Sequence, residues 1–148
     1  MKILIYGYGN PGRQDDGLGI LFSEAIEKWA KKDGIKGVTC DSNYQLNAED
    51  ALAMSKNDIV IFADAAKNKI KDIEFKKVKS GETISFSTHS MPPESVLALC
   101  IELYKKQPET YIMQIKGYEW GINGTVTKKA IENLHKSVKF IKKFISQQ

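Results

Sequence analysis

The stretch GYGNPGRQDDGLG, residues 7–19, follows directly on a short apolar run at residues 3–6. A run of that length, rich in aliphatic residues and bounded by glycine, predicts a buried central strand. The glycines after it let the backbone turn sharply. Residues 18–29 then carry apolar side chains at helical spacing. The start of the chain therefore predicts a strand, a glycine turn, the acidic pair Asp15 and Asp16, and a helix.

The same turn matches the dinucleotide-binding fingerprint G-x-G-x-x-G at Gly7, Gly9 and Gly12. In that fingerprint the helix opens at the glycines, so that its N-terminal amides meet a pyrophosphate. Here Asp15 and Asp16 intervene, and each would repel a diphosphate by about 1 kcal/mol even with full water screening. We therefore keep a dinucleotide-binding module only as a minor alternative, and expect the turn to hold a cation or to handle protons.

Composition narrows the class of protein. The chain has 148 residues, 42% hydrophobic and 27% charged, which predicts one soluble domain over residues 1–148. A net charge of +4 without a clustered basic stripe predicts no nucleic-acid partner. Because no apolar stretch is long enough to cross a bilayer and no signal-peptide pattern is present, we expect a cytoplasmic protein without membrane contact. Cys40 and Cys100 lack metal-binding or redox spacing and are interpreted as reduced structural thiols.

Strand and helix patterns alternate along the rest of the chain. Further strands are predicted at residues 38–40, 59–63, 83–87 and 110–115, with a lysine-rich edge strand within 67–82. Further helices are predicted at 48–54 with Asn47 as its N-cap, from the prolines at 92–93 to Gln107, and after Thr127, which is expected to cap the last helix. This alternation predicts an α/β fold: a three-layer α/β/α single domain with a mostly parallel central sheet of about five strands flanked by helices. The strand order, and whether an edge strand is antiparallel, stay open.

Candidate site residues follow the predicted strands. The first strand leads to Asp15 and Asp16, the third ends at Asp64, and the fourth leads to His89. Because the carboxyl ends of parallel strands share one edge, these side chains are expected in one crevice. Carboxylate and imidazole together suit a divalent transition metal such as zinc or nickel. Taken singly, an Asp at a strand end is as often a helix cap, and a lone His is more often structural; their joint occurrence favours a functional site.

With these residues in view, the sequence resembles the hydrogenase maturation endopeptidases, which remove a C-terminal extension from the large subunit of nickel–iron hydrogenase. The resemblance rests on three stretches. Gly7–Gly19 matches the pattern G-x-G-N-x4-D-D/E-G-x-G, an apolar strand ends in Asp64-Ala65, and Ser87–Ser90 leads into a helix. Tyr44–Leu46 and Gly117–Glu119 are also similar, so the resemblance covers nearly the whole chain. It implies a single α/β peptidase domain.

The resemblance also implies a set of site residues. Asp16, Asp64 and His89 would form the metal site, with nickel as the metal, supplied by the substrate; other divalent metals would also occupy such a site. Some members carry Glu at position 16, which leaves open whether Asp15 or Asp16 is the ligand. Asp41 matches another acidic position of the family. We expect Asp16, Asp41 and Asp15 as the catalytic residues, with one carboxylate assisting water attack as general base.

The resemblance implies a peptidase whose partner is the nickel–iron hydrogenase large-subunit precursor. Separately, we expect a monomer, although the sequence leaves the oligomeric state open. The lysine-rich loop Lys67–Lys79 and the segment Tyr118–Trp120 could border the docking surface, although for each single residue surface solubility or aromatic packing is the more common explanation. The main alternative is a self-contained metallohydrolase acting on peptides or small amides. A dinucleotide-binding module and a non-catalytic metal-binding or chaperone role are weaker alternatives.

Overall fold

A computed structural model describes residues 1–80 and 91–148. Its sheet has the order β2-β1-β3-β5-β4, in which only β4 runs antiparallel to its neighbour. The strands are β1 (Ile3–Tyr8), β2 (Val38–Asn43), β3 (Ile59–Ala66), β4 (Ile73–Lys77) and β5 (Glu109–Lys116). The predicted strand at 83–87 and His89 lie outside the described residues.

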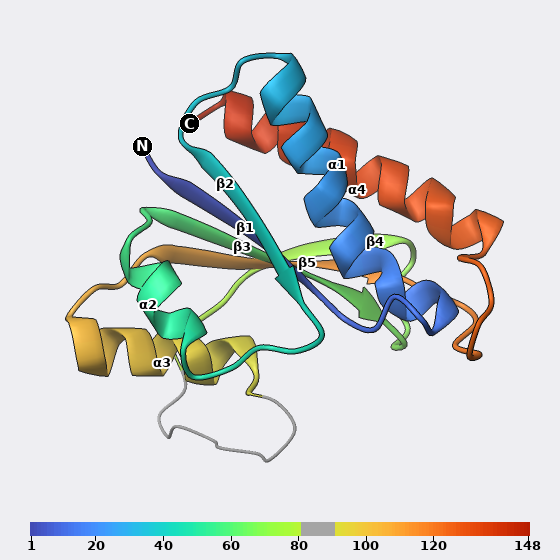
Figure 1. The fold of residues 1–148 in the computed structure, drawn as a ribbon, viewed down its shortest axis with the longest axis horizontal. Helices are drawn as coiled ribbons and strands as arrows, with labels where there is room; N and C mark the ends of the chain where they lie inside the picture. Colours follow the sequence, from blue (N-terminus) through green and yellow to red (C-terminus); the bar gives the residue numbers. More distant parts are fainter. Residues whose placement is uncertain (81–90) are drawn as a thin grey trace.

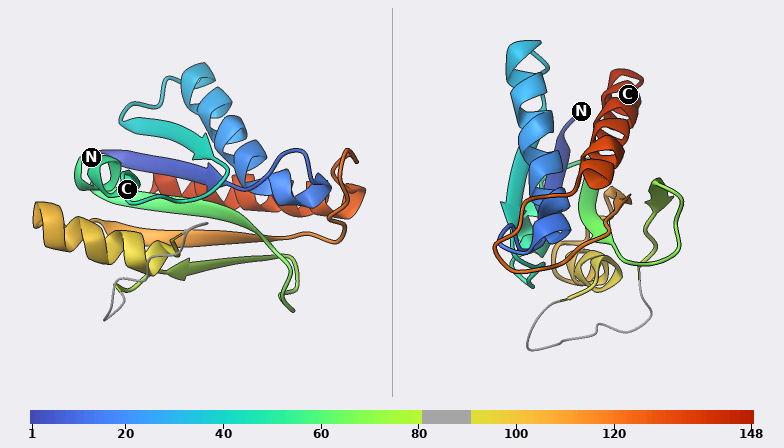
Figure 2. Two further views of the ribbon diagram at one scale, coloured as in Figure 1. Left: turned by 60° about the horizontal axis from the view of Figure 1, so that its bottom comes forward. Right: turned by 90° about the vertical axis from the view of Figure 1, so that its right-hand side faces the viewer.

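Helices cover both faces of the sheet, as Figures 1 and 2 show. The helices α1 (Leu18–Lys32) and α4 (Lys128–Ser146) lie on one face, and α2 (Asp50–Ser55) and α3 (Pro93–Tyr104) lie on the other. A short 3-10 helix, η1 (Gln14–Gly17), leads into α1. The predicted α/β/α architecture with a mostly parallel sheet is confirmed. None of the helices in the described part of the chain is both long and apolar enough to cross a bilayer.

Successive residues of a strand pack into two separate hydrophobic cores, one on each face of the sheet. Ile3 and Ile5 of β1 pack beneath α1 and α4, whereas Leu4 and Tyr6 pack beneath α2 and α3. Because side chains alternate along a strand, the even-numbered residues of β1 and β3 face the α2–α3 side. This parity carries Tyr8 and Asp64, at the carboxyl ends of the two strands, toward the same face.

The start of α1 packs backbone to backbone on β1. A Cβ atom on Gly7 would collide with the carbonyl group of Gly19. A Cβ atom on Gly19 would lie 2.5 Å from the carbonyl oxygen of Tyr8 and would collide with that of Ala63. Two glycines of the opening stretch therefore allow the close approach of helix to sheet, which sets the position of the acidic pair between them.

We predict that Gly19→Ala destabilises the protein by about 3 kcal/mol or more, because the added methyl group has no room between two strands and the helix. Gly12→Ala is the control, since a Cβ atom there would meet only the side-chain oxygen of Asn10, at 3.2 Å. Urea unfolding of both variants checks the prediction. Equal stability of the two variants would contradict it.

Two local predictions are wrong. The second strand does not end at Cys40 but continues to Asn43, because Asp41 and Asn43 keep their pairing with Tyr6 and Tyr8 of β1. Asn47 was expected to cap the helix at 48–54. Instead its own N–H donates to the carboxylate of Asp50 at 2.7 Å, and α2 begins at Asp50. By contrast, Thr127 caps α4 as predicted, accepting a hydrogen bond from the N–H of Ala130 at 3.3 Å.

Candidate active site

An open cavity of about 480 Å3 lies at the carboxyl ends of β1 and β3. Asp16 and Asp64 both line it, so the structure brings together these two of the expected site residues. The remaining lining residues are Tyr8, Gly9, Tyr44, Gln45, Leu46, Met91, Pro92 and Pro93. The cavity is thus bounded by the glycine turn, the segment after β2 and the start of α3.

Asp64 is a half-buried carboxyl group with a raised pKa. Burial is the main cause and the negative charge of Asp16 the next, and together they raise the pKa of Asp64 to about 7. Hydrogen bonds from the N–H of Ala65 and the hydroxyl of Tyr8 act in the opposite direction. Asp64 therefore exchanges its proton near neutral pH, and a cation entering the cavity would favour its charged form.

Asp16 projects from η1 and is held by the glycine turn. Its Oδ2 atom accepts a hydrogen bond from the N–H of Asn10 at 2.9 Å. A backbone N–H group of the turn, of the kind that would bind the pyrophosphate of a dinucleotide, is thus already bonded to a carboxylate of the protein itself. This contact favours a site for a cation over a site for a phosphate.

Asp15, the neighbour of Asp16, has a different environment and is fully buried. Its carboxylate accepts hydrogen bonds from the N–H groups of Tyr118 (2.7 Å), Glu119 (3.1 Å) and Thr127 (2.8 Å). The hydroxyl of Thr127 donates a fourth, at 2.8 Å. Burial opposes ionisation of Asp15, but these four hydrogen bonds outweigh it and lower its pKa. This carboxylate holds the loop after β5 onto η1 and does not line the cavity.

The two adjacent carboxylates should therefore respond differently to the same substitution. We predict that Asp15→Asn lowers the free energy of unfolding by about 2–4 kcal/mol, because an amide NH2 group would face N–H donors in a buried site. Asp16→Asn, the matched control, should change it by less than about 1 kcal/mol, because its remaining oxygen still accepts from Asn10. Denaturant unfolding at pH 7 measures both, and equal losses would contradict the assignment.

The raised pKa of Asp64 predicts a pH-dependent stability. Its pKa of about 7 in the folded state exceeds the ordinary value near 3.8, so its protonated form stabilises the fold and deprotonation destabilises it. The wild type should lose stability relative to Asp64→Asn as pH rises from about 4 through 7, by roughly 2–4 kcal/mol in total. Thermal unfolding of both proteins in chelator, from pH 4 to 8.5, tests this. Parallel curves would refute it.

The other two expected residues are not placed in this cavity by the described structure. Asp41 is exposed on β2, at the level of Tyr6, and lines a different cavity with Lys2, Glu49 and Lys56. His89 lies outside the described residues. Met91, two residues further along the chain, lines the cavity of Asp16 and Asp64.

Tyr8 is a site residue that the sequence analysis did not identify. It lines the cavity, and its hydroxyl donates a hydrogen bond to Asp64. Burial, with the charge of Asp64 as the next cause, raises the pKa of Tyr8 and keeps its hydroxyl protonated. Strand parity was the signal available, because Tyr8 follows Tyr6 by two residues and so points to the same face of the sheet.

The described lining of the cavity offers two side chains of the kind that bind metals, the carboxylates of Asp16 and Asp64. Among residues 1–80 and 91–148, no group of three or more His, Cys, Asp and Glu side chains is placed to hold a metal ion. The pair formed by Asp16 and Asp64 leaves most coordination positions of a divalent metal open. Burial, and after it the negative charge of Asp16, raises the pKa of Asp64, and a bound cation would reduce this repulsion between the two carboxylates.

No protein-family model matches the sequence, and no curated protein matches it. Solved structures do match, over nearly the whole chain. The NiFe hydrogenase maturation protease HycI from Thermococcus kodakarensis superposes with a TM-score of 0.77 at 21% identity, covering 98% of this chain and 92% of that chain. The chain has the fold of the hydrogenase maturation proteases.

Two further structures carry the same fold. The hydrogenase maturating endopeptidase HybD from E. coli matches with a TM-score of 0.72 at 16% identity, over 99% of this chain and 93% of that chain. The hydrogenase 2 maturation peptidase from Thaumarchaeota archaeon SCGC_AB-539-E09 matches with a TM-score of 0.73 at 14% identity, over the full length of both chains. At these identities, the property shared with the maturation proteases is the fold.

Proposed function

We propose that this protein is an endopeptidase that removes the C-terminal extension of a nickel–iron hydrogenase large-subunit precursor after nickel insertion. One observation carries the proposal: in a chain with the fold of the maturation proteases, Asp16 and Asp64 line one open cavity at the carboxyl end of the sheet. These are two of the three residues that the sequence resemblance implies as the metal site.

Asp16, Asp64 and His89 are proposed to contact nickel that the substrate already holds. Two carboxylates are too few to hold a divalent metal tightly by themselves, but they can complete a coordination sphere whose other ligands come from the precursor. Nickel would polarise the scissile carbonyl group. Discrimination between loaded and unloaded precursor then follows from electrostatics, because the carboxylate pair is satisfied only when the substrate brings its cation.

The same pair can also assist hydrolysis. A carboxylate that contacts the metal with one oxygen can take a proton from the attacking water with the other. We propose that Asp64 does so, because it lines the cavity with Asp16 and a metal held by the substrate would keep its carboxylate in the charged form that accepts a proton. The hydroxyl of Tyr8, which donates to Asp64, would hold that carboxyl group in position.

Asp15 and Asp41, which the sequence analysis placed among the catalytic residues, have other parts in this proposal. All four hydrogen bonds that Asp15 accepts serve to fix the loop after β5. Asp41 faces a separate cavity beside β2, where it is available for contact with the substrate chain but not with the carboxylate pair.

The direct test is the intact mass of a nickel-loaded precursor before and after incubation with the protein, beside a nickel-free precursor. Loss of one C-terminal peptide from the loaded form alone is the expected result. Cleavage of both forms would keep the peptidase and refute recognition of nickel. Cleavage of neither, together with hydrolysis of unrelated peptides, would favour the self-contained metallohydrolase.

We further predict that His89→Ala and Asp64→Asn each reduce the cleavage rate of the loaded precursor at least a hundredfold, because each removes a group proposed to contact the metal. His135→Ala is the matched control for the histidine, since His135 is exposed on α4, and it should cleave at the wild-type rate. The measurement is a time course of product by mass spectrometry, with circular dichroism to verify folding. A wild-type rate for His89→Ala would refute its role.

A further inference from the structure

A group of lysines gathers around two aromatic rings at the carboxyl edge of the sheet. We call it the basic patch, and it consists of Lys67, Lys116 and Lys129. These residues come from three places in the sequence: the turn between β3 and β4, the end of β5, and the start of α4. Tyr118 and Trp120, in the loop after β5, lie between them.

Contacts between lysines and rings join these segments. The Nζ atom of Lys67 lies 4.8 Å from the centroid of the Trp120 ring. The Nζ atoms of Lys116 and Lys129 lie 5.9 and 5.7 Å from that of Tyr118. Cation–π contacts of this kind hold the ammonium groups in place without neutralising their charge. Tyr118 is 38% exposed and the nearby Ile122 is 74% exposed, so the patch also offers apolar surface.

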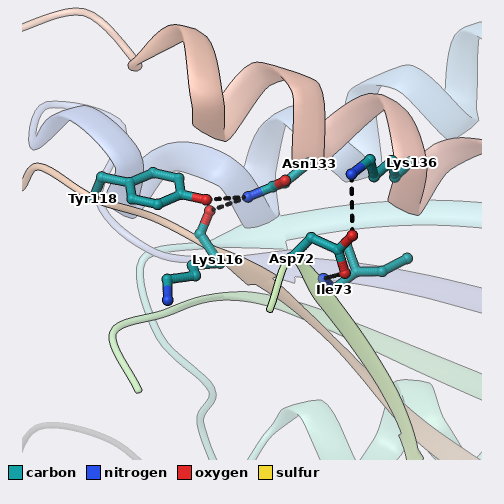
Figure 3. Close-up of polar contacts among 6 residues, drawn as sticks. All are labelled: Asp72, Ile73, Lys116, Tyr118, Asn133 and Lys136. Atoms are coloured by element: carbon teal, nitrogen blue, oxygen red, sulfur yellow. Dashed lines mark hydrogen bonds and ion pairs between the residues drawn. The ribbon is translucent and has the colours of Figure 1, made fainter. Parts of the chain in front are cut away.

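The surface beneath the patch is fixed by hydrogen bonds, several of which Figure 3 shows. The side-chain NH2 group of Asn133 donates to the carbonyl of Lys116 at 3.1 Å and to the hydroxyl of Tyr118 at 3.0 Å. Asp72 is paired with Lys136 at 3.0 Å. Trp120 lies over Gly117, where a Cβ atom would come within 2.7 Å of its ring. The lysines therefore project from a preformed surface.

The patch lysines are not part of the salt bridges that the described residues form. Among residues 1–80 and 91–148, none of the three patch lysines forms a salt bridge, and the neighbouring Asp72 is paired with Lys136. Acidic residues close to the patch in the sequence include Glu119, in the loop that carries the two rings, and Glu132, one turn along α4, and both are exposed. Lys128 and Lys129 lie in the first turn of α4, which has no acidic residue. Cations at a helix N-terminus oppose the helix dipole, so this arrangement costs stability and raises the local positive potential.

The patch is connected to the candidate active site through two segments of the chain. Lys67 follows Asp64 by three residues along β3 and the turn after it. The loop that carries Tyr118 and Trp120 is held by Asp15, the immediate neighbour of Asp16. The patch and the carboxylate pair therefore lie at the same, carboxyl end of the sheet.

We propose that the basic patch is the docking surface for an acidic face of the protein substrate, which it holds while the C-terminal segment enters the cavity. This inference rests on the proposed function for the identity of the partner and on charge complementarity for its chemistry. The patch would set the affinity for the precursor and its dependence on salt, and leave the chemical step unchanged.

The test measures binding of the nickel-free precursor, which the proposed function leaves uncleaved, so that affinity is read without turnover. The patch variant is Lys67→Gln/Lys129→Gln. Its matched control is Lys139→Gln/Lys143→Gln, which removes the same charge from exposed positions further along α4, about 15 and 21 Å along the helix axis from Lys129. Thermal unfolding verifies that both fold.

The patch variant is expected to raise Kd three- to tenfold and the control less than twofold. Wild-type Kd should rise between 50 and 300 mM salt, and that rise should shrink in the patch variant. With loaded precursor, KM should increase and kcat should not. An equal effect of the two variants, or no binding of the precursor, would overturn the proposal.

Two further outcomes separate the docking surface from the proposed function and an acidic protein from nucleic acid as the partner. Patch-dependent binding without cleavage of the loaded precursor would refute the proposed function and support the docking surface. Tighter binding of single-stranded DNA than of the precursor, weakened by the same variant, would overturn an acidic protein as the partner in favour of nucleic acid.

Discussion

The buried carboxylate of Asp15 joins parts of the chain that lie more than 100 residues apart. Four hydrogen bonds to it fix the loop after β5, and Thr127, which supplies two of them, also caps α4. The side chain of Gln14 adds to this junction by accepting from the N–H of Gly121 and donating to the carbonyl of Thr125. The loop, the last helix and η1 thus share one buried anchor. Because Asp16 is the next residue in η1, the anchor also sets where that carboxylate points.

A second constraint acts from the sheet. Four parallel strands end at one edge, and the glycine contact between β1 and α1 brings the acidic turn close against it. Alternation along β1 and β3 places Tyr8 and Asp64 on the face that bears the cavity. The resulting pair of nearby carboxylates lacks a counter-cation from the described residues, which costs free energy and is the kind of strain that binding sites retain.

Much of this was predictable from the sequence, for physical reasons. The apolar runs of β1 and β3 and the helical spacing of α1 gave the α/β architecture, since periodicity reflects which face is buried. The convergence of Asp16 and Asp64 followed from parallel strands alone. The different environments of Asp15 and Asp16 could not be predicted, because they depend on a loop more than 100 residues away. The length of β2 was underestimated because polar residues such as Asp41 and Asn43 are unusual in strands, and pairing with β1 overrides that preference.

We infer that Asp16 and Asp64 recognise nickel carried by the substrate. The most direct measurement is the ratio of the Kd for nickel-free precursor to that for nickel-loaded precursor, for the wild type and for Asp16→Asn/Asp64→Asn, under conditions that stop turnover. We expect a wild-type ratio of about ten or more, equivalent to at least 1.4 kcal/mol, and a ratio near one for the double variant. A double variant that keeps the wild-type ratio would contradict it.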